Sequence, residues 1–213
     1  IVALSTVLQT NERLSVLDIS RPLIPCVMDE TASHLSRMLK VNRTLVELNI
    51  SKFGLHDLGL QLLCEELYRA GPSSALQVLH ARSNKIQLVS DDSVAALARL
   101  LGSDTCRLNC LSIGANALRD EGALKLAEIV ATNHSLLQLD VTSNAISSRG
   151  LCALGRSISG HPMLQDVSLW GNSFDSAACL AMQQALQMVK LDFTVQQVKQ
   201  QVNGTYTYNC VRC

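Results

Sequence analysis

The most chemically suggestive residues of this sequence are four at its C-terminal end, Cys210-Val211-Arg212-Cys213. Two cysteines separated by two residues can supply half of the ligands of a tetrahedral zinc site. Such a site also needs a second cysteine pair or two suitably spaced histidines, and neither lies nearby in the sequence. We therefore interpret the pair as structural or coincidental, and we expect neither a metal nor an organic cofactor.

The five histidines give no catalytic pattern either. Four of them fall in predicted helices, loops or turns, whereas His80 lies on a predicted strand, and none has a cysteine or carboxylate at the spacing of a triad. The sequence has no glycine-rich phosphate loop, no His-Glu-x-x-His and no Gly-x-Ser-x-Gly. We expect the chain not to be an enzyme and to have no small-molecule substrate.

The stretch from Leu136 to Ile146 defines the element on which the rest of the chain is built. It has the pattern Leu-x-x-Leu-x-Val-x-x-Asn-x-Ile, and related units begin at Leu14, Leu45, Leu76, Leu108 and Leu164. This pattern indicates a leucine-rich repeat, in which a short strand is followed by a turn and a helix.

The spacing of the units predicts an α/β solenoid, or horseshoe. Successive units are 28 residues apart from Leu108 onward and 31 or 32 residues apart before it, which leaves room for a full helix in each. Stacking places the parallel strands on the concave face and the helices on the convex face. We predict that this array covers residues 1–188. Because the sequence opens at Ile1 in a helical pattern without Met, we also expect repeats to precede it.

Each position that recurs between the repeat units has a structural interpretation. The first, fourth and sixth positions point inward and build the core. The asparagine at the ninth position turns the chain and satisfies backbone groups of neighbouring loops; this applies to Asn84, Asn116, Asn144 and Asn172. Glycines just before the helices are interpreted as structural too, and these are Gly59, Gly122 and Gly150.

Residues 189–213 have a different pattern, typical of β-structure. Asn203-Gly204 separates two segments rich in β-forming residues, and this combination is a strong signal for a hairpin turn. We predict a C-terminal β-hairpin that caps the exposed end of the array.

Composition and charge narrow the range of partners. Lys+Arg and Asp+Glu both number 18, so the chain has no excess positive charge for nucleic acid. We expect no signal peptide, and no apolar run of this sequence is long enough for a membrane span. The eight cysteines are best explained as reduced thiols in the core, which predicts a reducing, cytoplasmic compartment.

Residues between the inward leucines face the concave surface because side chains alternate along a strand. Among them, together with those just past the strands, the candidates for protein binding are Trp170, Asp18, Glu47, His80, Arg82, Gln138, Asp140 and Asp166. Trp170 is the only tryptophan, and Trp and Arg are enriched among binding hot spots. Two interpretations of Trp170 stay open, an exposed anchor for a partner and a side chain packed on neighbouring loops.

Over residues 1–188 the repeat pattern resembles the ribonuclease-inhibitor-like superfamily of leucine-rich repeat proteins. The stretches 18–23, 38–48 and 169–175, together with 191–193 and 202–204, resemble one member of it more narrowly. This resemblance implies a non-enzymatic scaffold that binds other proteins in a large assembly, such as a ciliary or flagellar axoneme. The alternatives are a soluble inhibitor or regulator of a partner enzyme, acting through the concave face, and a GTPase-activating protein, whose residues have no counterpart here.

Overall fold

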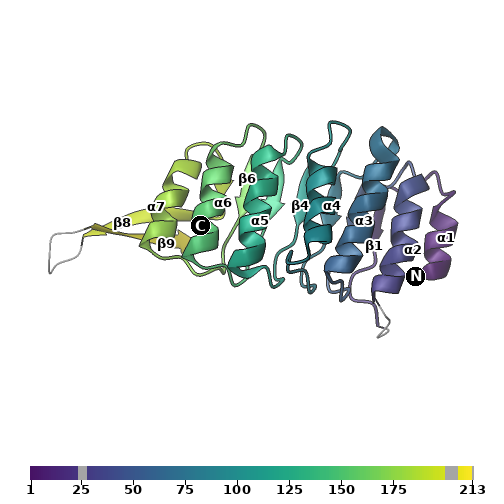
Figure 1. Cartoon of the computed structure of the whole chain (residues 1–213), viewed down its shortest axis with the longest axis horizontal. Helices are drawn as coiled ribbons and strands as arrows, with labels where there is room; N and C mark the ends of the chain where they lie inside the picture. The colour runs from purple at the N-terminus through teal and green to yellow at the C-terminus, as the bar shows by residue number, and fades with distance from the viewer. Residues whose placement is uncertain (24–27, 200–205, 213) are drawn as a thin grey trace.

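The computed structural model describes residues 1–23, 28–199 and 206–212, in which helices and strands alternate along one elongated array (Figure 1). The strands are β1 Val16–Asp18, β2 Glu47–Asn49, β3 Val78–His80, β4 Cys110–Ser112, β5 Gln138–Asp140, β6 Asp166–Ser168, β7 Lys190–Leu191, β8 Phe193–Lys199 and β9 Tyr206–Arg212. The helices are α1 Val2–Leu8, α2 Met28–Val41, α3 Asp57–Ala70, α4 Asp91–Leu101, α5 Arg119–Thr132, α6 Ser148–Ser159 and α7 Ser176–Ala185, with a 3-10 turn η1 at Gly71–Ser73.

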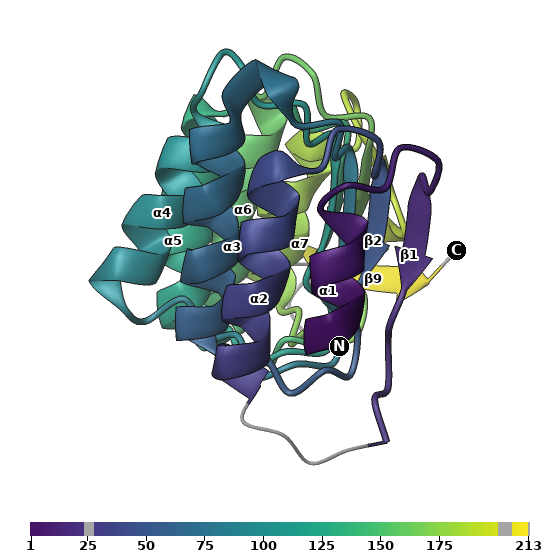
Figure 2. The same cartoon turned by 90° about the vertical axis from the view of Figure 1, so that its right-hand side faces the viewer.

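The first seven strands form one parallel sheet in which the order in space equals the order in the chain. Neighbouring strands pair at equivalent repeat positions, so that Leu48 lies beside Leu79 and Leu111 beside Leu139. The view along the array shows the helices as one layer and the strands as the other (Figure 2). The predicted leucine-rich-repeat solenoid is confirmed. We call the outer surface of the strand layer the strand face, which is the face predicted to be concave.

The sheet contains one strand more than the six that the repeat pattern predicts. β7 pairs in parallel with β6 through Val167 and Leu191, although residues 189–213 were predicted to belong to the cap. A strand of two residues is too short to be recognised from the leucine pattern. The sheet thus continues to Leu191, and the division of the chain into domains at residue 188 stays a prediction.

The core lies between the two layers and is built mainly from aliphatic side chains. The middle residue of each central strand is almost fully buried, as in Leu48, Leu79 and Leu111. Helix residues close the other side, among them Leu63 and Leu154, which have no exposed surface. The contribution of such a side chain is large, because truncating a buried leucine to alanine typically costs about 2–5 kcal/mol.

The repeat asparagines connect adjacent turns, as predicted. Asn84 accepts hydrogen bonds from the backbone N–H groups of Phe53 (2.9 Å) and Leu55 (3.0 Å) in the preceding repeat, and its amide donates to the carbonyl of Ile50 (3.0 Å). The residue before each asparagine has a left-handed backbone, for example Ser83 with φ of 52°. Left-handed geometry is unfavourable for residues other than glycine, so the side-chain hydrogen bonds help to hold this sharp turn.

A second row of contacts between repeats lies where the helices begin. The carboxylate of Asp57 accepts hydrogen bonds from four successive N–H groups of the next loop, those of residues 87–90, at 2.7–3.4 Å. In a similar way, the carboxylate of Asp120 accepts hydrogen bonds from the backbone N–H groups of Ser147 and Gly150 in the following repeat. These carboxylates fix the spacing of repeats at the helix N-termini, which the leucine pattern does not reveal.

An antiparallel pair, β8 and β9, packs against α7 at the C-terminal end (Figure 1), which confirms the predicted hairpin strands. Phe193 is fully buried, and its ring lies 4.8 Å from that of Phe174. The backbone N–H of Tyr208 donates to Ser176 Oγ of α7 at 2.9 Å. The predicted Asn203-Gly204 turn and Cys213 lie outside the described residues.

One detail of the predicted helices differs in the structure. Gly59, Gly122 and Gly150 lie inside the first turn of their helices rather than before them. At Gly122 a Cβ atom would overlap the carbonyl oxygen of Gln87, so close approach of a loop explains that glycine. Within the described residues, no helix is long and apolar enough to cross a membrane.

Candidate protein-binding site

The strand face carries the predicted candidate residues in two adjacent rows. One row contains Glu47, Gln138 and Asp166, and the other contains Asp18, His80 and Asp140, because the first and third residues of a strand lie on the same side of the sheet. The middle residue of every strand is buried. Arg82 and Trp170 lie just past their strands, beside the second row.

Arg82 and Asp140 form the centre of a hydrogen-bonded group that spans three repeats. The Arg82 Nη1 atom is paired with Asp140 Oδ2 across 58 residues of sequence, and it also donates to Thr142 Oγ1 at 3.0 Å. The same carboxylate oxygen accepts from Ser112 Oγ at 2.6 Å. The other oxygen of Asp140 accepts from the backbone N–H and the hydroxyl of Thr142, at 3.0 and 2.8 Å. Both oxygens of Asp140 are therefore engaged within the protein.

These contacts keep Asp140 ionised. Burial by itself raises the pKa of the Asp140 carboxyl, but hydrogen bonds from Ser112, Thr142 and Arg82 outweigh burial and leave the pKa below its usual value. A charged carboxylate with fixed donors holds the Arg82 guanidinium in one orientation, while 40% of the Arg82 side chain stays exposed. Asp140 is thus a positioning residue for an exposed cation.

Gly114 makes this arrangement possible. It lies just past β4, in the repeat between those of Arg82 and Asp140, and it is buried. A Cβ atom there would meet the Arg82 guanidinium and would lie 2.7 Å from Thr142 Oγ1. The absence of a side chain at residue 114 therefore lets Arg82 cross the intervening repeat.

Arg82, Asp140 and Trp170 line one open hollow of about 370 Å³ at the C-terminal end of the strand face. The remaining lining residues are Thr142, Ser143, Ser168, Asp192 and Arg212. The structure thus brings together three of the eight candidates. Trp170 is half-buried and packs against the core while it lines the hollow, so it combines both interpretations offered by the sequence.

Two charged residues of the hollow, Asp192 and Arg212, were not among the candidates from the sequence. Asp192 accepts hydrogen bonds from the backbone N–H groups of Leu169 (2.8 Å) and Trp170 (3.1 Å), and so fixes the backbone that carries the tryptophan. Both residues were assigned to the cap. The leucine pattern gave no signal that could have placed Asp192 beside the hollow, because strand β7, which precedes it, has only two residues.

The other five candidates lie outside the hollow. Glu47 and His80 face each other, with His80 Nε2 and Glu47 Oε1 3.5 Å apart. Asp166 is paired with Lys190 of β7 at 3.3 Å, and Gln138 is exposed on the neighbouring strand β5. Asp18 is on the first strand, where it accepts from Asn49 at 3.0 Å. These residues extend the polar surface of the strand face toward the N-terminal repeats.

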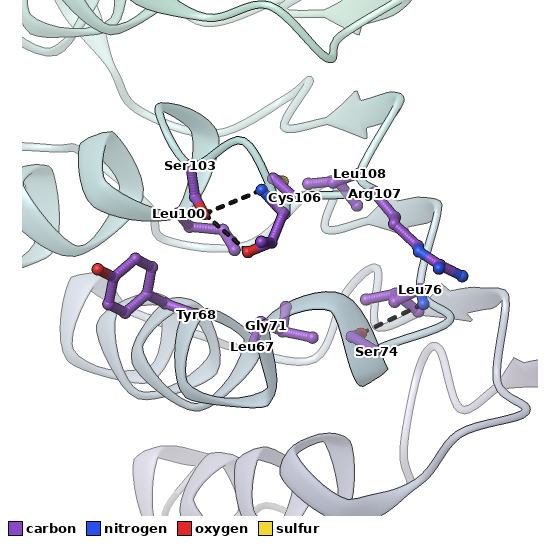
Figure 3. A pocket seen from close by; sticks show the side chains of 11 residues that line it. Leu67, Tyr68, Gly71, Ser74, Leu76, Leu100, Ser103, Cys106, Arg107 and Leu108 are labelled. Carbon is purple, nitrogen blue, oxygen red and sulfur yellow. Dashed lines mark hydrogen bonds between the residues drawn. The ribbon is translucent and has the colours of Figure 1, made fainter.

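Other depressions are less suited to binding a partner. The one between the C-terminal ends of α3 and α4, lined by Tyr68, Cys106 and Leu108 among others, holds only about 10 Å³ (Figure 3), which is about the space of one water molecule. A shallow depression of about 540 Å³ lies beside Asp57 and Val89, but the Asp57 carboxylate is already engaged with backbone N–H groups. On the helical layer, Tyr68, Arg69 and Arg99 line a smaller depression of about 100 Å³. The hollow is larger and joins a tryptophan ring to two guanidinium groups on the strand face.

The fold and this surface define the class of protein. The chain is a leucine-rich repeat protein of the ribonuclease-inhibitor-like type, and residues 132–155 match the family described as leucine-rich repeat. Leucine-rich repeat domains typically bind other proteins and are generally non-catalytic. Among the described residues, no group of three or more His, Cys, Asp or Glu side chains is placed to hold a metal ion.

More particularly, the chain is similar to leucine-rich repeat-containing protein 34 of Mus musculus, with 35% identity over 181 residues that cover 85% of this chain and 42% of that protein. It is 31% identical over 143 residues to NACHT, LRR and PYD domains-containing protein 13 of Homo sapiens, covering 67% of this chain and 13% of that protein. The chain therefore spans less than half the length of these relatives. Among solved structures, the tropomodulin C-terminal domain of Caenorhabditis elegans has the same fold, with a TM-score of 0.54, 16% identity and coverage of 74% of this chain and 90% of that one.

Proposed function

We propose that this chain is a non-enzymatic scaffold that binds a protein partner in the hollow at the C-terminal end of its strand face. The observation that carries the proposal is the convergence of Trp170, Arg82 and Arg212 on one open concavity. Trp and Arg are the residues most enriched among binding hot spots, and hot spots gather in central pockets of an interface.

The hydrogen bonding of the hollow suggests the chemistry of the partner. The carboxylates of Asp140 and Asp192 are engaged with donors of this chain. The groups left to meet a partner are the Trp170 ring and the exposed guanidinium groups. A segment that carries carboxylates beside an apolar side chain would complement them, because guanidinium binds carboxylate with two parallel hydrogen bonds.

Fixed side chains favour binding because less conformational freedom is lost when the complex forms. Asp140 holds Arg82, and Asp192 holds the backbone of Trp170, so the two main contacts are already oriented. This pre-organisation supports a binding role for the hollow.

Binding measurements with variants test the proposal. A pull-down with mass spectrometry first identifies a partner, and its affinity is then measured with the purified proteins. Trp170→Ala and Arg82→Ala should each weaken binding by about tenfold or more, which corresponds to about 1.4 kcal/mol. Tyr68→Ala is the matched control, because Tyr68 is an exposed aromatic residue on α3, in the helical layer.

The variants also reveal failure of the proposal. If circular dichroism confirms that all three variants are folded, unchanged affinity of both Trp170→Ala and Arg82→Ala removes the hollow from the interface. Weaker binding of Tyr68→Ala alone would instead place the partner on the helical layer.

Membership in a large assembly, such as a ciliary or flagellar axoneme, is the finer part of the proposal and rests on the family resemblance. Fractionation of cells that contain the protein tests it. A scaffold of this kind should stay with a salt-resistant, microtubule-based complex. A regulator of an enzyme should instead elute as a free one-to-one complex, and its target would need to complement a strand face whose carboxylates are largely engaged.

A further inference from the structure

Two cysteines meet where the C-terminal hairpin packs on the last helix. Cys179 lies on α7 and is 1% exposed, and Cys210 lies on β9 and is half-buried. Their Sγ atoms are 2.8 Å apart, although 31 residues separate them in the sequence. The elements that carry them, α7 and β9, pack against each other at this end of the array (Figure 1).

The distance is much shorter than an ordinary contact between unbonded sulfur atoms and needs little change to become a bond. A disulfide has an S–S length of about 2.05 Å, so a movement of about 0.8 Å would suffice. The two backbones are already held in place, because Tyr208 donates to Ser176 at 2.9 Å and Phe193 is buried against Phe174. Among cysteines in the described ranges, no second pair makes such a contact.

We propose that Cys179 and Cys210 form a reversible disulfide that locks the hairpin onto the last repeat. The oxidant is a low-molecular-weight disulfide such as oxidised glutathione. The more accessible Cys210 thiolate attacks it, forms a mixed disulfide and releases one glutathione thiolate. The Cys179 thiolate then attacks the Cys210 sulfur and releases the second glutathione thiolate. The protein loses two electrons and two protons, and one oxidised glutathione becomes two reduced glutathione molecules.

The surroundings of the pair set the rate of this reaction. Burial, and then the neighbouring Cys179, raise the pKa of the Cys210 thiol above its usual value. A raised pKa lowers the thiolate fraction at neutral pH, and the thiolate is the attacking species. Oxidation should therefore be slow near neutrality and faster as the pH rises, so that brief exposure to an oxidant leaves the pair reduced.

The bond would connect elements that are otherwise held only by packing and hydrogen bonds. In the reduced protein, β9 can separate from α7 by local opening, as terminal elements commonly do. The disulfide removes that opening, because it joins the two elements covalently. Arg212 lies two residues beyond Cys210 on the same strand, so the lock also restricts the strand that carries this lining residue of the hollow.

The test uses the full chain, purified in reduced form and equilibrated in glutathione buffers of increasing oxidised fraction. After alkylation of free thiols, peptide mass spectrometry should identify a Cys179–Cys210 cross-link and the loss of two alkylatable thiols. Cys152→Ser is the matched control, since Cys152 lies on the neighbouring helix α6, and it should keep the cross-link. Cys179→Ala and Cys210→Ala should each abolish it.

A second measurement follows the effect of the disulfide on local opening of the hairpin. Limited proteolysis should cut the hairpin of the oxidised chain several-fold more slowly than that of the reduced chain, and reduction should restore cleavage. The proposal is overturned if both cysteines remain alkylatable in the most oxidising buffer. It is also overturned if Cys210 pairs instead with Cys213, which a Cys213→Ser variant distinguishes, because this variant should retain the Cys179–Cys210 bond.

Discussion

Replacement of Asn144 by alanine should destabilise the array more than any other asparagine substitution near the C-terminal end. Asn144 is completely buried. Its Oδ1 accepts from the backbone N–H groups of Asn116 (3.1 Å) and Leu118 (3.4 Å), and its Nδ2 donates to the carbonyls of Ile113 and Val141, both at 3.0 Å. Alanine provides none of these contacts.

The magnitude follows from which groups keep a partner. The carbonyl of Ile113 still accepts from Asn116 Nδ2 at 2.8 Å, and that of Val141 from Asn172 Nδ2 at 3.1 Å. Only the backbone N–H groups of Asn116 and Leu118 lose their hydrogen-bond acceptor. An unsatisfied buried donor costs about 1–3 kcal/mol, so the loss of an acceptor for two donors in Asn144→Ala should lower the free energy of unfolding by about 2–6 kcal/mol.

The assay is urea-induced unfolding followed by far-UV circular dichroism. Asn109→Ala is the matched control, because Asn109 is half-buried and takes part through its backbone groups, with bonds to Gln77 and Leu137. That control should cost less than about 1 kcal/mol. A loss below about 1 kcal/mol for Asn144→Ala, or an equal loss for both variants, would show that the asparagines do not hold the turns together.

Three further substitutions test other contacts. Gly114→Ala should displace Arg82 from Asp140, so an NMR titration should find the pKa of Asp140 closer to its usual value, with unfolding changed by less than about 1 kcal/mol; an unaltered pKa would contradict the geometry. Burial lowers the pKa of His161 in the folded chain, where its neutral Nδ1 accepts backbone hydrogen bonds. The unfolded chain therefore takes up a proton first, and the wild-type protein should lose stability as the pH falls through about 6.5. His161→Asn should make unfolding less pH-dependent in this range, and an equally steep dependence would exclude His161 as its source. Asp57→Ala should cost about 1–2 kcal/mol and speed amide hydrogen exchange of residues 87–90, whereas unchanged exchange would show that the carboxylate does not hold that loop.

The periodic part of this protein could be read directly from the sequence. The leucine positions, the helix in each unit and the structural role of Asn84 and its equivalents are local properties, because each repeat packs mainly on its neighbours. The alternation of strand residues likewise predicted which side chains share the strand face, including Asp140 and Gln138. The outward position of these residues required no knowledge of distant contacts.

Deviations from the period were harder to predict. Strand β7 has two residues, which is too few for a detectable pattern. On α7, Leu180 is 49% exposed, whereas the smaller Ala178 and Cys179 are buried. Around the end of an array the geometry changes, because the hairpin replaces a further repeat as the covering element.

The sequence by itself determined that this protein is a stack of strand–helix units with an aliphatic interior and an exposed row of strand side chains, since burial alternates along each unit. Only the tertiary structure decided which of those side chains act together. Arg82 reaches Asp140 across one intervening repeat because Gly114 leaves space, and Cys179 meets Cys210 because the hairpin folds back on α7. Such contacts depend on the rise and rotation between repeats, which no single repeat encodes.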